Sequence, residues 1–170
     1  RRAVREFAER EVSPHVRAWD EAQHFPVELL PDLAALGLMG MRVPESDGGA
    51  GLSAVDYCIC IEELARVEPG VALSVAAHNG LACAHLAHAG TPEQRQRFLT
   101  PLARGARLGA WALTESTSGS DAGTTLTTSA TTVRTAPRQP GSGLRLGPGC
   151  RHIDGLTGLD TTGDHGVSAP

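Results

Sequence analysis

The residues best suited to chemistry lie between Trp111 and Asp121, in the stretch WALTESTSGSD. A short apolar run ends at Thr114, and a turn of small residues from Ser118 to Ser120 follows it. Such a turn exposes backbone N–H groups and hydroxyls, which suit a phosphate or the edge of a flavin ring. An ordinary Asx or Ser turn between two strands has the same composition, and the spacing alone favours that simpler interpretation.

Three histidines, His78, His85 and His88, fall in one predicted helix, and the last two lie three residues apart on one face. Two histidines at this spacing are able to share a metal ion. The His-Glu-x-x-His signature of zinc enzymes is absent, however. We therefore predict polar contacts between helices or subunits at these positions, and no metal site.

Composition excludes several other classes of site. The chain has 170 residues, and all 15 of its basic residues are arginines, so no lysine is present for a Walker-type phosphate site or a Schiff base. A net charge of −4 gives no basic footprint for nucleic acid. The pair Gly141 and Gly143 is not a dinucleotide fingerprint, because the last glycine falls at 147 and no strand-turn-helix surrounds it. No Gly-x-Ser-x-Gly elbow occurs either.

Four cysteines, Cys58, Cys60, Cys83 and Cys150, form no CxxC pair. The first three lie in apolar helical pattern, where a free thiol behaves as a small buried hydrophobe. This usage favours a reducing compartment, the cytoplasm, or the mitochondrial matrix if the source is eukaryotic. Because the chain starts at Arg1 within a helical pattern, we expect the true amino terminus to lie upstream.

The elements that must position these residues are helices up to about residue 107. Apolar periodicity predicts five of them, near residues 1–19, 26–36, 53–67, 69–89 and 92–104. Pro14 should interrupt the first helix, Gly37 should end the second, and Ser53 and Thr91 should cap the third and fifth.

Two apolar faces follow from the spacing within these helices. The second helix is predicted to bury a leucine stripe: Leu29, Leu30, Leu33 and Leu36. The third is predicted to bury another face: Ala54, Cys58, Ile61 and Ala65. The longest stretch without Asp, Glu, Arg or Lys runs from residue 69 to 92 and contains three histidines and Asn79. We read it as a buried helix at the centre of a bundle, not as a membrane span.

The pattern changes after residue 107. Strands are predicted at 108–114 and within 124–133, where short apolar or Thr-rich runs occur. From about Arg134 proline and glycine dominate, and too few apolar residues remain to offset the entropy of ordering, which predicts a disordered tail.

In three places the sequence resembles the acyl-CoA dehydrogenase family, and the matches follow the family's order. Residues 111–121 resemble the middle-domain segment aromatic-x-hydrophobic-Thr-Glu-Pro-x-x-Gly-Ser-Asp. Residues 43–51 resemble its Val-Pro-Glu…Gly-Gly-x-Gly loop, and residues 90–105 resemble its last helix before the barrel. The resemblance covers about residues 1–133 and implies a mainly α fold. An amino-terminal helical bundle, residues 1–107, would be followed by the first strands of an incomplete β-barrel domain, residues 108–133, and an irregular tail, residues 134–170.

The resemblance also implies a cofactor, FAD, and residues that contact it. In the family these positions line the flavin or reach its phosphates, which carries over to Trp111, Leu113, Thr114, Gly119 and Ser120. The last of them also lies on the thioester side of the substrate. The family oxidises an acyl-CoA thioester to 2-enoyl-CoA, passes the hydride to FAD, gives electrons to an electron-transfer flavoprotein, and forms homo-oligomers.

The chain departs from the family pattern in ways that bear on activity. Ser116 replaces a proline, and Asp47 stands where an aromatic residue is common. Nothing after Arg134 matches the family's next motifs, and that text resembles an out-of-frame reading. The family's catalytic base is a Glu of a carboxyl-terminal domain absent here, so we assign no catalytic residue, and Glu115 matches a structural position. The chain alone is therefore expected to be incomplete for catalysis. Two alternatives stay open: an acyl-CoA oxidase or flavin monooxygenase on the same fold, and a non-catalytic helical fragment.

Overall fold

Five continuous helical segments make up most of the described residues, as the periodicity predicts. The computed structural model describes residues 1–112, Ser120 and residues 130–134. The first segment is α1 (Arg2–Phe7), the π-helical turn η1 (Ala8–Val12), the 3-10 turn η2 (Ser13–His15) and α2 (Val16–Glu21). The second is η3 (Val27–Leu29) with α3 (Leu30–Ala35), and after the 3-10 turn η4 (Glu45–Asp47) the third is α4 (Ala54–Ala65). The fourth is α5 (Pro69–Ala77), η5 (His78–Cys83) and α6 (Ala84–Ala89); the fifth is α7 (Pro92–Gln94), η6 (Arg95–Leu99) and α8 (Thr100–Ala103).

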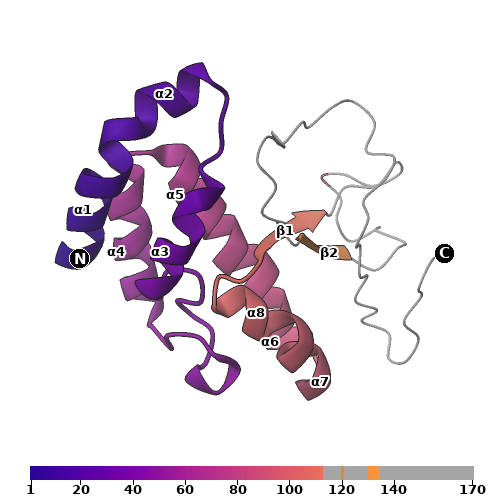
Figure 1. Ribbon diagram of the computed structural model, residues 1–170. Helices are drawn as coiled ribbons and strands as arrows, with labels where there is room; N and C mark the ends of the chain where they lie inside the picture. The colour runs from indigo at the N-terminus through magenta and orange to yellow at the C-terminus, as the bar shows by residue number, and fades with distance from the viewer. Residues whose placement is uncertain (113–119, 121–129, 135–170) are drawn as a thin grey trace.

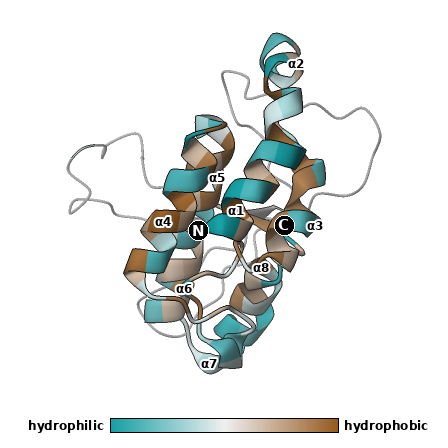
Figure 2. Cartoon of the chain, turned by 90° about the vertical axis from the view of Figure 1, so that its left-hand side faces the viewer, coloured by the Kyte–Doolittle hydropathy of each residue, from teal (hydrophilic) through white to brown (hydrophobic). Residues whose placement is uncertain are grey.

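The fourth segment, α5 to α6, runs through the helical bundle, and we call it the spine helix (Figure 1). It is long and apolar enough to cross a membrane by composition, but its residues contribute to both buried clusters of the described chain. One cluster takes Val71, Ala72 and Val75 and packs them against α1, α3 and α4; the other takes Cys83 and Leu86 and packs them against η6 and α8. The prediction of a buried central helix is thus confirmed in part: one side of the segment lies in the core, whereas Leu73 is 71% exposed. Figure 2 shows hydrophobic (brown) and hydrophilic (teal) residues alternating along these helices.

Two of the predicted apolar faces are partly wrong. In α4 the buried residues are Cys60, Glu63 and Leu64, whereas Cys58 is exposed. The predicted buried face is therefore rotated around the helix axis from the observed one. Glu63, an acidic residue, is buried at a position where apolar spacing would lead one to expect a hydrophobic residue. In the second segment Leu36 is 39% exposed, because α3 ends at Ala35 and the chain then turns through Gly37 at φ +74°.

Side-chain capping fixes where α4 begins. The Ser53 hydroxyl accepts a hydrogen bond from Asp56 N at 3.2 Å, and the Asp56 carboxylate accepts one from Ser53 N at 3.3 Å. Thr91 and Gln94 form the same reciprocal pair at the start of α7. Both predicted caps are thereby confirmed.

Replacing Ser53 by alanine is expected to cost about 1 kcal/mol of the free energy of unfolding, because the backbone N–H of Asp56 loses its acceptor. Ser74 is a matched control, since its hydroxyl donates to Gly70 O within the helix and caps nothing. Ser74→Ala should change stability by less than about 0.5 kcal/mol. Urea unfolding followed by circular dichroism measures both, and equal midpoints for the two variants would contradict the capping role.

The loop between α3 and α4 folds back on itself without regular structure. Ala50 N donates to Gly40 O at 2.9 Å, and Gly51 N donates to Val43 O at 2.9 Å. Gly49 lies so close that a Cβ built on it would be 2.2 Å from Val43 O. Glycine is required at that position by this contact with the backbone.

Asp47, which departs from the family pattern, ties this loop to the fifth helical segment. Its Oδ2 lies 3.6 Å from Arg95 Nη1, which joins η4 to η6. Neither Asp47 Oδ2 nor Arg95 Nε has a hydrogen-bond partner, so the pair is a long ionic contact within the described chain. An ionic contact thus occupies the position where the family commonly packs an aromatic ring.

Candidate functional site

The candidate flavin segment begins in a short strand that leaves the helical bundle. Strand β1 (Leu108–Ala112) pairs antiparallel with β2 (Ala130–Arg134), with Trp111 opposite Thr131. Strand β1 falls within the region 108–114 predicted as strand, and β2 overlaps the predicted region 124–133 and ends one residue beyond it. Ser120 is an exposed bend. Three other candidates, Leu113, Thr114 and Gly119, lie outside the described residues.

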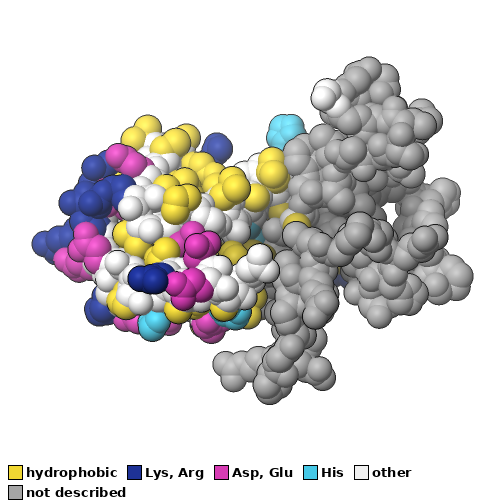
Figure 3. All heavy atoms as spheres, turned by 90° about the horizontal axis from the view of Figure 1, so that it is seen from above, with side chains coloured by type: hydrophobic (Ala, Val, Ile, Leu, Met, Phe, Trp, Pro, Cys, Tyr) yellow, Lys and Arg dark blue, Asp and Glu magenta, His cyan; other side chains and the backbone are white. Residues whose placement is uncertain are grey.

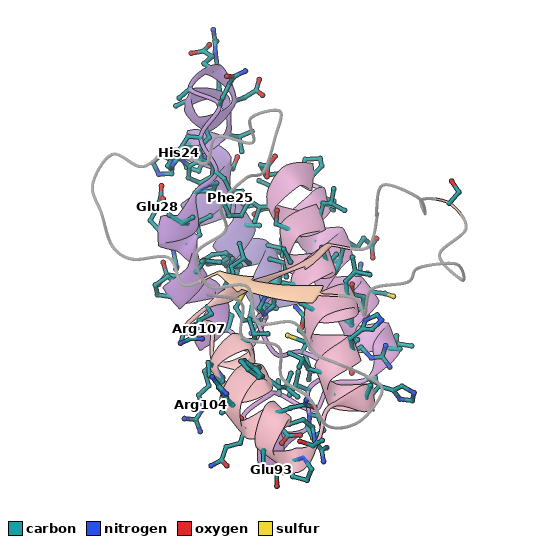
Figure 4. All side chains as sticks on the ribbon, turned by 90° about the vertical axis from the view of Figure 1, so that its right-hand side faces the viewer. His24, Phe25, Glu28, Glu93, Arg104 and Arg107 are labelled. Carbon is teal, nitrogen blue, oxygen red and sulfur yellow. The ribbon has the colours of Figure 1, made fainter. Side chains whose placement is uncertain are left out.

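Strand β1 rests directly on the spine helix and α8. A Cβ built on Gly109 would lie 2.6 Å from Ala82 Cβ and 3.2 Å from a methyl group of Leu102. The strand backbone therefore approaches η5 as closely as glycine allows. Figure 4 shows the two strands lying across the helices, with Arg104 and Arg107 to one side of them.

A buried imidazole connects three parts of the chain where β1 packs on η5. His78 is fully buried, and its Nδ1 accepts a hydrogen bond from Gly109 N at 2.9 Å. Because a backbone N–H only donates, Nδ1 must be unprotonated, and Nε2 carries the ring proton. Nε2 then donates to Met39 O at 2.9 Å. His78 thus links β1, η5 and the loop after α3.

The neighbouring Asn79 completes the attachment of that loop. Its Oδ1 accepts from Met41 N at 2.9 Å, and its Nδ2 donates to Leu38 O at 2.8 Å and Val75 O at 3.0 Å. Buried backbone groups without regular partners must be satisfied by side chains or water. His78 and Asn79 together fill this requirement for Leu38 O, Met39 O and Met41 N.

The Cys83 thiol lies 3.5 Å from His78 Nε2, at the spacing of a nucleophile and its base. The environment argues against that chemistry, because both side chains are buried and the imidazole already donates to Met39 O. Burial raises the pKa of the Cys83 thiol to about 12 and lowers the pKa of His78. Both groups are neutral near pH 7, so we assign the pair to structure, not catalysis.

A second buried polar group, Glu63 of α4, is surrounded by arginines. Its carboxylate accepts two hydrogen bonds from Arg5, both at 2.8 Å, and one from Arg66 at 3.0 Å. Arg1 Nη1 lies 3.5 Å away. Hydrogen bonds from Arg5 lower the pKa of Glu63 to about 2, against the opposing effect of burial. Figure 3 shows charged side chains gathered at this end of the molecule, and the cluster joins α1 to α4.

The histidines predicted to make polar contacts take different places. His78 is in the core, whereas His85 and His88 of α6 are exposed. His85 Nδ1 lies 2.8 Å from Leu81 O of its own helix. Across the described residues, no three His, Cys, Asp or Glu side chains gather as metal ligands.

A shallow depression of about 540 Å³ opens elsewhere on the helical domain. Small residues of α3, the glycine loop and the chain after α8 line it, with Arg104 as the one charged group among them. The lining holds no imidazole, thiol or carboxylate and none of the candidate flavin residues. It therefore offers no catalytic group and does not coincide with β1.

Comparison with known proteins places the helical part in one family. The model of the acyl-CoA dehydrogenase N-terminal domain matches residues 1–106. A probable acyl-CoA dehydrogenase of Bacillus subtilis is 41% identical over 127 residues, which are 75% of this chain and 33% of the relative. A subunit of the caffeyl-CoA reductase–Etf complex of Acetobacterium woodii is 39% identical over 129 residues, 75% of this chain and 34% of that subunit.

Solved structures agree with the sequence comparison. The glutaryl-CoA dehydrogenase of Mycobacterium smegmatis, solved in complex with FADH2, superposes with a TM-score of 0.66 at 30% identity. The match covers 72% of this chain and 31% of that one. The chain thus spans about a third of the length of the relatives it matches.

Proposed function

The chain belongs to the acyl-CoA dehydrogenase family, and from that membership we propose that it is the amino-terminal part of an FAD-dependent oxidoreductase acting on acyl-CoA thioesters. The observation that carries the proposal is the order of elements. The family's helical domain, residues 1–106, leads directly into a strand that contains Trp111 and continues into the sequence LTESTSGSD.

We assign the flavin contacts to Trp111, Leu113, Thr114, Gly119 and Ser120, and the thioester contact to Ser120. The structure describes two of these positions. Trp111 lies in β1, whose Gly109 packs on η5, and Ser120 is exposed. A bound flavin would supply a hydride acceptor, while the protein supplies orientation and hydrogen bonds.

The complete enzyme would convert an acyl-CoA to 2-enoyl-CoA and give its electrons to an electron-transfer flavoprotein, as a homo-oligomer. A partner of this kind is in keeping with the Etf complex to which one relative belongs. The free thiols of Cys58, Cys60 and Cys83 suit the reducing interior of a cell, the cytoplasm or the mitochondrial matrix. We assign no catalytic base to this chain, and we propose that residues 1–170 alone do not turn over substrate.

Titrating FAD with the chain of residues 1–170 tests the proposal. We expect FAD fluorescence to be quenched on binding, and Trp111→Ala to weaken the affinity at least about tenfold, since an aromatic contact with the flavin would be lost. Trp19 of α2 lies far from β1 in sequence and structure, so Trp19→Ala is a matched control that should leave the affinity unchanged.

Three results would count against these proposals. The same affinity for the wild-type chain and Trp111→Ala would remove Trp111 from the flavin site. Absence of any FAD binding by a folded wild-type chain would favour the non-catalytic helical fragment. Oxidation of a short-chain acyl-CoA by this chain with an artificial electron acceptor would contradict the proposal that the chain alone is inactive.

A further inference from the structure

His78 is the buried titratable group that the proposed function does not use. Its two ring nitrogens are both committed, one to Gly109 N of β1 and one to Met39 O of the loop after α3. The strand that leads to the candidate flavin residues is therefore attached to the helical domain by a group that is able to titrate.

We propose that His78 is a positioning residue whose neutral imidazole holds the start of β1 on the helical domain, and whose protonation releases that strand. The Gly109 N–H needs an acceptor at Nδ1. A protonated ring carries hydrogens on both nitrogens, so Nδ1–H would face the Gly109 N–H and the hydrogen bond would be lost. Gly109 also packs closely on Ala82, since a Cβ built on it would lie 2.6 Å from Ala82 Cβ, so the strand and η5 are in direct contact beside this hydrogen bond.

Burial is the larger effect and disfavours a charged ring at His78, against the opposing effect of hydrogen bonds to the backbone of Met39 and Leu102. The elements packed against it bring Met39 from the loop, Leu102 from α8 and Gly109 from β1, and its titratable neighbour is the neutral Cys83 thiol. The charged residues on or beside these elements are Arg42, Arg104 and Arg107. None of them pairs with His78 in the described part of the chain, and their positive charge does not favour an imidazolium.

The direction of the pH effect follows from linkage. Burial lowers the pKa of His78 in the folded state, so the released or unfolded state binds the proton more readily. The attachment of β1 is complete above the ordinary histidine pKa and weakens as the pH falls below about 6.5. The equilibrium for release should then rise by up to about tenfold per pH unit until the ring titrates in the attached state as well.

The test is the hydrogen-exchange protection of the Gly109 amide in the ¹⁵N-labelled chain of residues 1–170, between pH 7.5 and 5. This amide donates to His78, so its protection reports on the link directly. The amide of Leu64, buried in α4, reports on unfolding of the helical domain. We expect Gly109 protection to fall by about tenfold per pH unit below about 6.5 while Leu64 protection stays level. The ¹⁵N shifts of the ring should show an Nε2–H tautomer at pH 7.5.

Variants separate positioning from simple packing. In His78→Asn an amide oxygen stands near the place of Nδ1 and does not titrate, so Gly109 should stay protected and its pH dependence should vanish. In His78→Leu protection should be lost at every pH, by at least about tenfold. His88→Gln, on the exposed part of the same helix, should behave as the wild type.

Three results would overturn the inference: level Gly109 protection in the wild type, a wild-type slope in His78→Asn, or parallel loss at Gly109 and Leu64. If His78→Leu does not fold, the pH dependence of Gly109 protection in the wild type and in His78→Asn still tests the inference. The consequence for flavin rests on the proposed function: FAD affinity should fall with the same midpoint in the wild type but not in His78→Asn. A chain that binds no FAD at pH 7.5 counts against the proposed function and leaves the Gly109 result standing.

Discussion

Gly49→Ala is expected to destabilise the helical domain by about 3 kcal/mol or more. The added Cβ would lie 2.2 Å from Val43 O and 2.4 Å from Val43 Cβ, and real Cβ atoms do not approach other atoms so closely. Val43 cannot simply move away, because its side chain is buried and its carbonyl accepts the hydrogen bond from Gly51 N. Relief of the clash therefore breaks the fold of the loop between α3 and α4.

The control for this substitution is Gly80→Ala. Gly80 lies within the spine helix, and a Cβ there would meet Tyr57 Oη at 3.5 Å, an ordinary contact. Alanine in place of glycine inside a helix should stabilise the domain by about 0.5–1 kcal/mol. The two variants are thus expected to shift the urea midpoint in opposite directions. Equal shifts would mean that the loop is not packed as described.

Glu63→Gln is expected to lower the thermal midpoint at pH 7 by about 10 °C or more. The amide keeps the shape of the side chain but cannot accept from Arg5, Arg66 and Arg1 as a carboxylate does, and one of its two ends becomes a donor. The surface pair of Arg17 and Glu21 is the control, because both side chains are largely exposed. Glu21→Gln should move the midpoint by no more than about 2 °C.

The pH dependence of the same cluster has a definite sign. The pKa of Glu63 is about 2 in the folded chain, below its ordinary value of 4.5, so its contribution is complete above pH 4.5. That contribution is lost as the pH falls from 4.5 toward 2, where the carboxylate becomes protonated. Thermal unfolding of wild type and Glu63→Gln across this range should show the two midpoints converging in acid. A constant difference between the two midpoints across this range would mean that the ionised carboxylate does not cause the stabilisation.

The sequence predicted the helices better than their buried faces. Five helical segments and the caps at Ser53 and Thr91 appear where proline, glycine and apolar spacing put them. The face of α4 was predicted wrongly because a single sequence does not show that Glu63 is buried with Arg5, 58 residues away. Charge pairing between distant segments leaves no periodic signal, so apolar spacing alone placed Cys58 in the core.

The candidate site was predictable only in part. The family motif identifies the residues from Trp111 to Ser120, and the structure bears on two of their positions, a strand and an exposed bend. The attachment of β1 through His78 was not foreseen, although a signal was present. Adjacent His78 and Asn79 interrupt an otherwise apolar helix, and buried polar side chains need partners. Which backbone groups would be those partners depends on tertiary contacts 31 and 39 residues away.

The side chains that satisfy backbone groups of residues 38–41 also set an order of events in folding. The turn from α4 to α5 is short in sequence, so this helical hairpin has little loop-closure entropy to overcome and can form early. The loop after α3 gains hydrogen-bond partners for Met39 O and Met41 N from His78 and Asn79, which lie 39 and 38 residues further on. Until the spine helix has formed, the backbone groups Leu38 O, Met39 O and Met41 N lack the side chains that bind them in the folded chain. During synthesis, this loop would have to wait for residue 79 to emerge from the ribosome before it could fold.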